Sequence, residues 1–284
     1  MEEETVQHIG DDQEPLSGRE EYESILEAAR SILLQVGTYQ KRLFRAERPG
    51  KGTEKLEHEF VSAVDIKSEE KIRKGLSHLF PEAGFYGEES QQTMGKRYTW
   101  VVDPLDGTTN YLSGFDYWSI SVALFEGNAP VLGLVYRPQT DEFFTAIKGH
   151  GAFHEARRLP RAQQFLLKDG LIGTGLPYRS PDTASSFFSA AEEILYRCRD
   201  IRRTGSAALD LSYVAAGYLQ GFWEVDLKPY DVGAALLFLE EVGCPVTTFT
   251  NTAYNPFTCR SLVTGFPGLK DELTDILANH YHLD

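Results

Sequence analysis

The sequence has few cysteines. Cys198, Cys244 and Cys259 are the three in 284 residues, and they lie far apart without a CxxC pair. A sparse, odd number argues against a disulfide framework or a thiolate metal site and is typical of a reducing compartment. We therefore expect three buried structural thiols.

The sequence also lacks long apolar runs. No stretch approaches the roughly 18 to 20 consecutive apolar residues of a membrane helix, and the mean hydropathy is −0.32. The chain begins Met1-Glu-Glu-Glu4, where a signal peptide would be basic and then apolar. We expect a soluble, cytoplasmic protein without a membrane partner.

Positive charge is in short supply. The sequence has 28 Lys and Arg residues and 42 Asp and Glu residues, which gives a formal charge of −14. This balance argues against binding to nucleic acid or anionic membranes. Part of the acidity lies in residues 1–16, which have little to bury and are predicted to form a disordered acidic tail. The remaining acidity is explained if clustered carboxylates bind divalent cations.

Apolar periodicity predicts an α+β protein. Strands are expected at 98–103, 119–125, 131–136, 142–146, 171–174, 221–225 and 261–264. Helices are expected at 17–44, 65–80, 181–196, 207–218, 231–241 and 269–278. Because strands cluster early and alternate with helices later, residues 17–284 are predicted to form one unit. Its two layered halves, about 17–155 and 156–284, would share an active-site seam.

Two local features qualify this pattern. Ser17 is expected to cap the first helix, with Glu20 completing a capping box. The polar stretch 45–59 contains Pro49, Gly50 and Gly52 and is predicted to be a mobile loop.

The most informative segment is Trp100-Val-Val-Asp-Pro-Leu-Asp-Gly-Thr-Thr-Asn110. An apolar strand delivers Asp103 to its end, Pro104 is expected to break the strand, and Asp106 follows in the turn. Paired carboxylates of this kind suit Mg²⁺. An ordinary Asp-rich turn is the alternative explanation, although the whole string is more specific than a lone Asp-Gly-Thr.

The same segment offers a place for an anion. Gly107 permits a tight bend, and Thr108 and Thr109 can open a short helix with free backbone N–H groups. Two further carboxylates are candidates elsewhere: Glu88 follows the apolar pair Phe85-Tyr86, and Asp231 begins a helix. For Asp231 the local sequence alone favours a helix cap over a metal ligand.

Four motifs in order resemble the inositol monophosphatase family, with similarity from about Ser17 onward. They are Val61-Ser-Ala-Val-Asp65, Gly87-Glu-Glu-Ser90, the segment from Trp100 to Tyr111, and Tyr230-Asp-Val-Gly-Ala-Ala235 followed by Glu240-Glu-Val-Gly243. Tyr230 stands where the family has Trp. The resemblance implies a layered αβαβα sandwich of the inositol monophosphatase and fructose-1,6-bisphosphatase type, a homodimer, and inhibition by lithium.

The resemblance also implies a site with two or three Mg²⁺ ions. Glu88, Asp103 and the Leu105 carbonyl would hold one ion, and Asp103, Asp106 and Asp231 a second. Lys51 or Lys55 would lie near a third, weaker ion.

The other implied roles concern water, phosphate and substrate. Asp65 and Thr108 would orient or deprotonate the attacking water, with Glu88 also counted as catalytic. Backbone N–H groups of Gly107 and Thr108 would bind phosphate. The small residues Gly205, Ser206 and Ala207 would lie beside the polyol, although close helix packing explains them equally well. Glu224 would accept hydroxyl hydrogen bonds.

The expected function is Mg²⁺-dependent hydrolysis of a small polyol or sugar phosphate, first of all inositol monophosphate. No phosphoenzyme is expected, and the histidines are given no catalytic role. Fructose 1,6-bisphosphate, histidinol phosphate and a 3′-phosphonucleotide remain alternatives, and Arg179, Arg202 or Arg203 could bind a second phosphate. A non-catalytic regulatory or scaffold protein is the rival of another class, disfavoured because all five metal or catalytic carboxylates are present.

Overall fold

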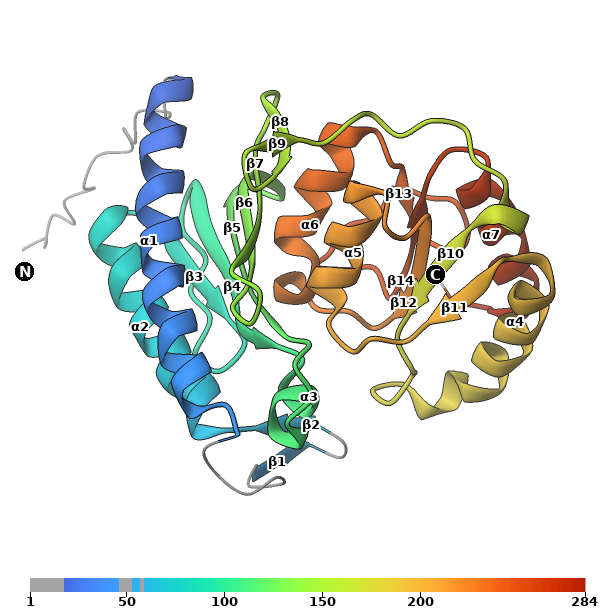
Figure 1. The fold of residues 1–284 in the computed structure, drawn as a ribbon, viewed down its shortest axis with the longest axis horizontal. Coiled ribbons are helices and arrows are strands. Elements are labelled where there is room, and N and C mark those ends of the chain that lie inside the picture. Colours follow the sequence, from blue (N-terminus) through green and yellow to red (C-terminus); the bar gives the residue numbers. More distant parts are fainter. Residues whose placement is uncertain (1–17, 46–52, 57–58, 284) are drawn as a thin grey trace, which may run out of the picture.

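Helices and sheets alternate in five layers, as Figure 1 shows. The computed structural model describes residues 18–45, 53–56 and 59–283, without the side chains of 53–61. The predicted acidic tail, Ser17 and Lys51 lie outside this range, as does the side chain of Lys55. The layered αβαβα sandwich predicted from the sequence is confirmed.

The seven helices of the described part lie in the outer layers, in the central layer and beside the site. Their bounds are α1 Arg19–Leu43, α2 Ala63–Leu79, α3 Thr108–Ser113, α4 Ala184–Arg197, α5 Ala207–Ala216, α6 Pro229–Val242 and α7 Leu269–His280. Short 3₁₀ turns occupy Leu167–Asp169 and Pro181–Thr183.

Two large sheets form the β layers. The first has the order β3-β4-β5-β6-β7-β8-β9, with only β3 and β4 parallel. Its strands are β3 Gly84–Gly87, β4 Tyr98–Asp106, β5 Ser119–Glu126, β6 Ala129–Arg137, β7 Glu142–Ile147, β8 Gly151–His154 and β9 Arg157–Arg158. The second has the order β11-β10-β12-β14-β13. Its strands are β10 Leu171–Thr174, β11 Asp200–Arg202, β12 Gly221–Val225, β13 Val246–Thr247 and β14 Ser261–Gly265.

Side-chain alternation along the strands explains why both faces of each sheet are covered. In β4, Trp100 and Val102 pack with α1 and α2, whereas Val101 packs with α5 and α6. In β12, Phe222 faces the same central helices and Trp223 faces α4 and α7. The central helices are thus buried between two sheets, which accounts for their nearly continuous apolar sequence.

Strand β4 corrects one prediction. Pro104 does not end the strand, which continues to Asp106 with an irregular register against β5 between Asp103 and Asp106. A proline is tolerated at such an irregularity because no ladder hydrogen bond is needed from it. Both acidic residues therefore belong to one buried strand end.

Three smaller predictions are also corrected. The first helix is capped by Gly18, without a side-chain hydrogen bond. The stretch 45–59 is not all loop, because β1 (Thr53–Leu56) pairs antiparallel with β2 (Glu59–Val61). This pairing depends on backbone hydrogen bonds, which an apolar sequence pattern does not reveal. All three cysteines are free thiols, but only Cys244 is buried.

No helix among the described residues is both long enough and apolar enough to cross a membrane.

Candidate active site

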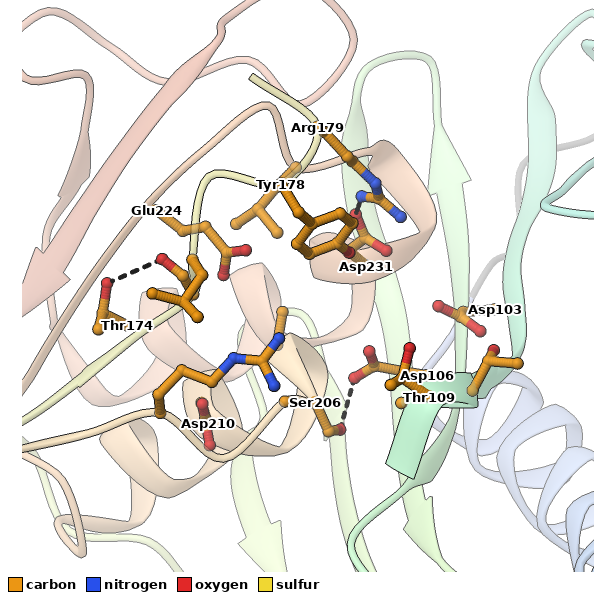
Figure 2. Close-up of a pocket in the computed structure, with 18 of the residues that line it drawn as sticks. Asp103, Asp106, Thr109, Thr174, Tyr178, Arg179, Ser206, Asp210, Glu224 and Asp231 are labelled. Carbon is orange, nitrogen blue, oxygen red and sulfur yellow. Dashed lines mark hydrogen bonds and ion pairs between the residues drawn. The ribbon is translucent and has the colours of Figure 1, made fainter. Parts of the chain in front are cut away.

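Three buried carboxylates meet between the two sheets. Asp103 and Asp106 come from the end of β4, and Asp231 comes from the first turn of α6. One oxygen of each lies within 4.8 Å of the corresponding oxygens of the other two. Figure 2 shows the three side chains facing one cleft. The fold thus brings together residues that are more than 120 positions apart in the sequence.

Hydrogen bonds fix the two carboxylates of β4. Asp103 Oδ1 accepts the N–H of Leu105 at 2.9 Å. Asp106 Oδ2 accepts the hydroxyl of Ser206 at 2.5 Å and the N–H of Ala208 at 2.8 Å. Asp106 therefore joins the first sheet to the N-terminus of α5 while it faces the cleft.

Asp231 is held in a similar way at the start of α6. Its Oδ2 accepts the N–H of Lys228 at 2.6 Å and Nη1 of Arg179 at 2.8 Å. Asp231 thus takes part in the helix cap that the local sequence favours, and its carboxylate also belongs to the acidic cluster.

The electrostatics of the cluster fit a bound cation. Burial, followed by the charge of Asp231, raises the pKa of Asp106 to about 7. Burial and then the neighbouring carboxylates raise the pKa of Asp103 and of Glu88 well above their usual values. Carboxylates gathered in a low-dielectric site repel one another, and a hard divalent ion with oxygen ligands relieves that repulsion. The donor set therefore fits a metal such as Mg²⁺.

The cleft around the cluster is strongly acidic. It has a volume of about 300 Å³, and its wall contains six carboxylates and two arginines. These charged residues are Glu88, Asp103, Asp106, Asp210, Glu224, Asp231, Arg179 and Arg203. Part of the excess of acidic over basic residues in the chain thus lies in this cleft, where a cation would bind.

Asp65 reaches the cleft only through Thr108. The Thr108 hydroxyl donates to Asp65 Oδ1 at 2.8 Å and also lies 3.1 Å from the Leu105 carbonyl oxygen. Asp65 Oδ2 accepts the N–H of Ser62 at 3.1 Å in a capping box of α2. Burial raises the pKa of Asp65 to about 6. Thr108 lines the cleft and Asp65 lies behind it.

Gly107 lines the cleft as the N-cap of the short helix α3, which begins at Thr108 as the sequence predicts. Its φ is +99°, and a Cβ there would lie 3.0 Å from the Tyr117 carbonyl oxygen and 3.1 Å from that of Gly205. Glycine is therefore required both by the backbone conformation and by the close approach of two chain segments.

The predicted substrate residues also lie in the cleft wall. Gly205, Ser206 and Ala207 lead into α5, and Glu224 lies on β12. Burial, followed by the charge of Asp231, raises the pKa of Glu224 well above its usual value. Gly175 faces this carboxylate so closely that a Cβ would lie 1.9 Å from Glu224 Oε1. Sequence reasoning missed Gly175, whose role depends on contact between neighbouring strands.

Asp210 is a further carboxylate of the cleft wall that sequence reasoning missed. It lies in α5, where a buried acidic residue in an apolar helix is the signal that could have found it. Its Oδ1 accepts the hydroxyls of Tyr117 at 3.0 Å and Thr204 at 2.5 Å. Burial raises its pKa to about 7.

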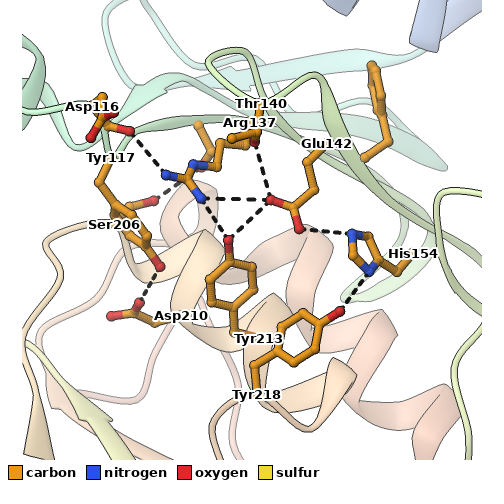
Figure 3. Close-up of polar contacts among 12 residues, drawn as sticks. Asp116, Tyr117, Arg137, Thr140, Glu142, His154, Ser206, Asp210, Tyr213 and Tyr218 are labelled. Atoms are coloured by element: carbon orange, nitrogen blue, oxygen red, sulfur yellow. Dashed lines mark hydrogen bonds and ion pairs between the residues drawn. The ribbon is translucent and has the colours of Figure 1, made fainter.

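A polar network extends from this region away from the cleft (Figure 3). Arg137 lies over the Tyr117 ring at 4.9 Å and donates to the hydroxyl of Tyr213 at 3.0 Å. Tyr213 in turn donates to Glu142, which lies 2.8 Å from His154 Nε2. His154 thus takes part in a network that joins β7 and β8 to α5, and no histidine of the described residues lines the cleft.

Gln40 supports the site from α1 and was also missed. Its Nε2 donates to the Pro104 carbonyl oxygen at 2.7 Å, and its Oε1 accepts from Trp118 Nε1 at 3.3 Å. Gln40 is fully buried among apolar helix positions. It therefore fixes the backbone between the two acidic residues of β4.

Replacing Gln40 by Leu is expected to lower the free energy of unfolding by about 2–4 kcal/mol, because buried polar groups at Pro104 and Trp118 lose their partners. Urea unfolding in saturating Mg²⁺ measures this loss. The Gln35→Leu variant is the control, since Gln35 is exposed on the same helix. Equal stability of the two variants would contradict the supporting role of Gln40.

Comparisons with known proteins agree with this fold. Inositol-1-monophosphatase of Rhizobium meliloti is 35% identical over 90% of this chain and 93% of its own length. Fructose-1,6-bisphosphatase/inositol-1-monophosphatase of Aquifex aeolicus is 34% identical over 90% of this chain and 96% of its own length. The crystal structure of extragenic suppressor protein suhB from Bartonella henselae has a TM-score of 0.84 at 31% identity, covering 91% of this chain and all of that one.

The layered fold and its acidic cleft define a phosphatase. The chain belongs to the inositol monophosphatase family, whose family model matches residues 21–280. The resemblance read from the four motifs is thereby confirmed, and the acidic cluster agrees with the metal dependence of the family.

Proposed function

We propose that the chain is a Mg²⁺-dependent phosphomonoesterase whose substrate is a small polyol phosphate, with inositol monophosphate the preferred candidate. The observation that carries the proposal is the buried cluster of Asp103, Asp106 and Asp231, which lies in a cleft large enough for such a substrate. Hard oxygen ligands in a partly open site favour Mg²⁺ over softer transition metals.

The metal ligands proposed are those implied by the family motifs. Glu88, Asp103 and the Leu105 carbonyl would hold one ion, and Asp103, Asp106 and Asp231 another. All five residues line the same cleft. When bound, the ions would lower the pKa of water and stabilise charge on the phosphate oxygens.

The remaining catalytic roles belong to residues around Thr108. Its hydroxyl, held by Asp65, would orient the attacking water, and Asp65 would accept the proton through this pair. Backbone N–H groups at Gly107 and Thr108 would donate to phosphate oxygens at the start of α3. Water attacks phosphorus directly in this scheme, so the reaction has no covalent enzyme intermediate.

The alcohol part of the substrate would lie against the second sheet. Glu224 would accept hydrogen bonds from hydroxyls, and Gly205, Ser206 and Ala207 would let the ring approach the backbone closely. These contacts favour a neutral polyol with several hydroxyls.

A bisphosphate is the second candidate substrate because Arg203 lines the cleft. Its side chain is exposed and forms no ion pair with any residue that the structure describes. A guanidinium in that position could bind a second phosphate. The Aquifex aeolicus relative is named for fructose 1,6-bisphosphate as well as for inositol 1-phosphate.

Three further proposals are a homodimer, a cytoplasmic location and inhibition by lithium; the first and third come from the family resemblance, and the second from the few, scattered cysteines. Light scattering tests the homodimer, and phosphate release at increasing LiCl concentration tests the inhibition by lithium.

Phosphate release from four substrates tests the proposed function. The panel contains inositol 1-phosphate, fructose 1,6-bisphosphate, histidinol phosphate and 3′-phosphoadenosine 5′-phosphate, each with Mg²⁺ and with EDTA. The expected result is Mg²⁺-dependent release, fastest from inositol 1-phosphate. If the folded protein binds Mg²⁺ but releases phosphate from none of them, the regulatory or scaffold function becomes the better explanation.

A further inference from the structure

Arg179 forms an ion pair inside the proposed metal site. It lies in the segment between β10 and α4, and its Nη1 is 2.8 Å from Asp231 Oδ2. The exposed fractions of the two side chains are 17% and 6%, so the pair is largely shielded from water. Figure 2 shows the guanidinium directed at Asp231 on the edge of the cleft.

The segment that carries Arg179 is anchored to its surroundings. The hydroxyl of the next residue, Ser180, donates to the carboxylate of Asp226. Asp226 is held in turn by Arg260, whose Nε and Nη2 donate to it at 2.8 and 2.7 Å. Arg179 is thus presented to Asp231 by a fixed backbone, unlike a cation at the end of a flexible surface side chain.

The ion pair has two opposing effects on a metal ion held by Asp103, Asp106 and Asp231. It orients Asp231, because Oδ2 is occupied by Arg179 and by the Lys228 N–H. Loss of an orienting contact of this kind lowers metal affinity by about 10- to 100-fold. The ion pair also places the positive charge of Arg179 beside a bound metal ion. At the effective dielectric of a partly buried site, the repulsion between these two positive charges is larger than the benefit of orienting Asp231.

We propose that Arg179 acts as a built-in counter-ion that weakens metal binding at Asp103, Asp106 and Asp231 in the free enzyme. Arg179 also lines the cleft, where its guanidinium can form a bidentate contact with a phosphate group. Phosphate therefore draws the positive charge away from Asp231 and adds negative charge beside the ion. Tight occupancy of this metal position consequently depends on the presence of the anionic substrate. This inference rests on the proposed function.

Calorimetric titration of the metal-free protein with Mg²⁺, with and without inorganic phosphate, tests the proposal. Without phosphate, Arg179→Met and Arg179→Gln are expected to bind Mg²⁺ about tenfold more tightly than the wild type, because the repelling charge is gone. Phosphate is expected to raise the Mg²⁺ affinity of the wild type strongly and that of these variants much less. The Gln variant keeps a hydrogen-bond donor for Asp231. It therefore allows the measurement even if the Met variant unfolds without metal.

Three control variants isolate the charge at Asp231. Arg179→Lys keeps the charge and is expected to bind Mg²⁺ as the wild type does. Arg203→Met removes the other cleft arginine, which forms no ion pair with Asp231, and Ser180→Ala removes the anchoring hydroxyl but keeps Arg179. Both should change Mg²⁺ affinity less than the loss of Arg179.

The outcomes separate this inference from the proposed function. If the wild-type protein does not bind Mg²⁺, the proposed function itself fails. If the wild type binds Mg²⁺ but the neutral Arg179 variants bind it equally or more weakly, Arg179 only positions Asp231 and the counter-ion role is overturned.

Discussion

The Asp103→Asn variant is expected to lose phosphatase activity by about 10³-fold or more, because a shared metal ligand supports several kcal/mol of transition-state stabilisation. Asp103 is the residue that both proposed metal positions have in common. An amide keeps the shape of the side chain but removes the negative charge that a divalent ion requires. Phosphate release at saturating Mg²⁺, together with calorimetric Mg²⁺ binding, measures the effect.

This loss should not arise from unfolding. Burial, followed by the neighbouring carboxylates, raises the pKa of Asp103, so a neutral amide avoids both the desolvation cost and the repulsion in the metal-free protein. The thermal midpoint of Asp103→Asn in EDTA is expected to equal or exceed that of the wild type. Asp210→Asn makes the same substitution in the same cleft wall but outside the cluster. Comparable activity in the two variants would argue against Asp103 as a shared ligand.

The Asp65→Asn variant is expected to lower kcat by about 10²- to 10³-fold, the usual contribution of a positioned general base. Asp65 holds the Thr108 hydroxyl at 2.8 Å, and its carboxylate is the proton acceptor nearest to that hydroxyl in the proposed scheme. The metal ligands themselves are unchanged, so Mg²⁺ affinity should stay close to that of the wild type. Steady-state kinetics and calorimetry together separate the two quantities.

The capping role of Asp65 provides the competing explanation, and Ser62→Ala is its matched control. Ser62 and Asp65 form the capping box of α2, and loss of such a cap costs about 1 kcal/mol of stability. Ser62→Ala is expected to lower stability by this amount with little change in kcat. A fall in kcat as large as that of Asp65→Asn would assign Asp65 a purely structural role.

The fold could be predicted best where an element buries a regular apolar face. The sequence predicts β10 and β12 with the bounds that the structure has, because both are short apolar strands bordered by Gly or polar turns. The strands β8, β9, β11 and β13 have two to four residues and no comparable signal. These strands form because the backbone N–H and C=O groups of a neighbouring strand accept them as partners. This pairing depends on the tertiary structure and not on the local sequence.

The residues of the site divide in the same way. The acidic residues of β4 could be predicted from one continuous string, whereas the local sequence around Asp231 favours a cap over a cluster. Gln40 could not be predicted, because its function depends on the carbonyl of Pro104, 64 residues away. For Arg179 the sequence indicates only phosphate binding, since the contact of this residue with Asp231 spans 52 residues.

The two β layers bring different parts of the site to their shared seam. Asp103 and Asp106 lie at the end of β4 and Glu88 follows β3 in the first sheet, whereas Glu224 lies on β12 and Arg203 follows β11 in the second. Substitutions confined to the residues of the second sheet alter which alcohol fits the cleft, without disturbing the carboxylates of the first sheet. A lineage built on this scaffold can therefore diversify its substrates through inherited changes in one layer while its hydrolytic chemistry is conserved in the other.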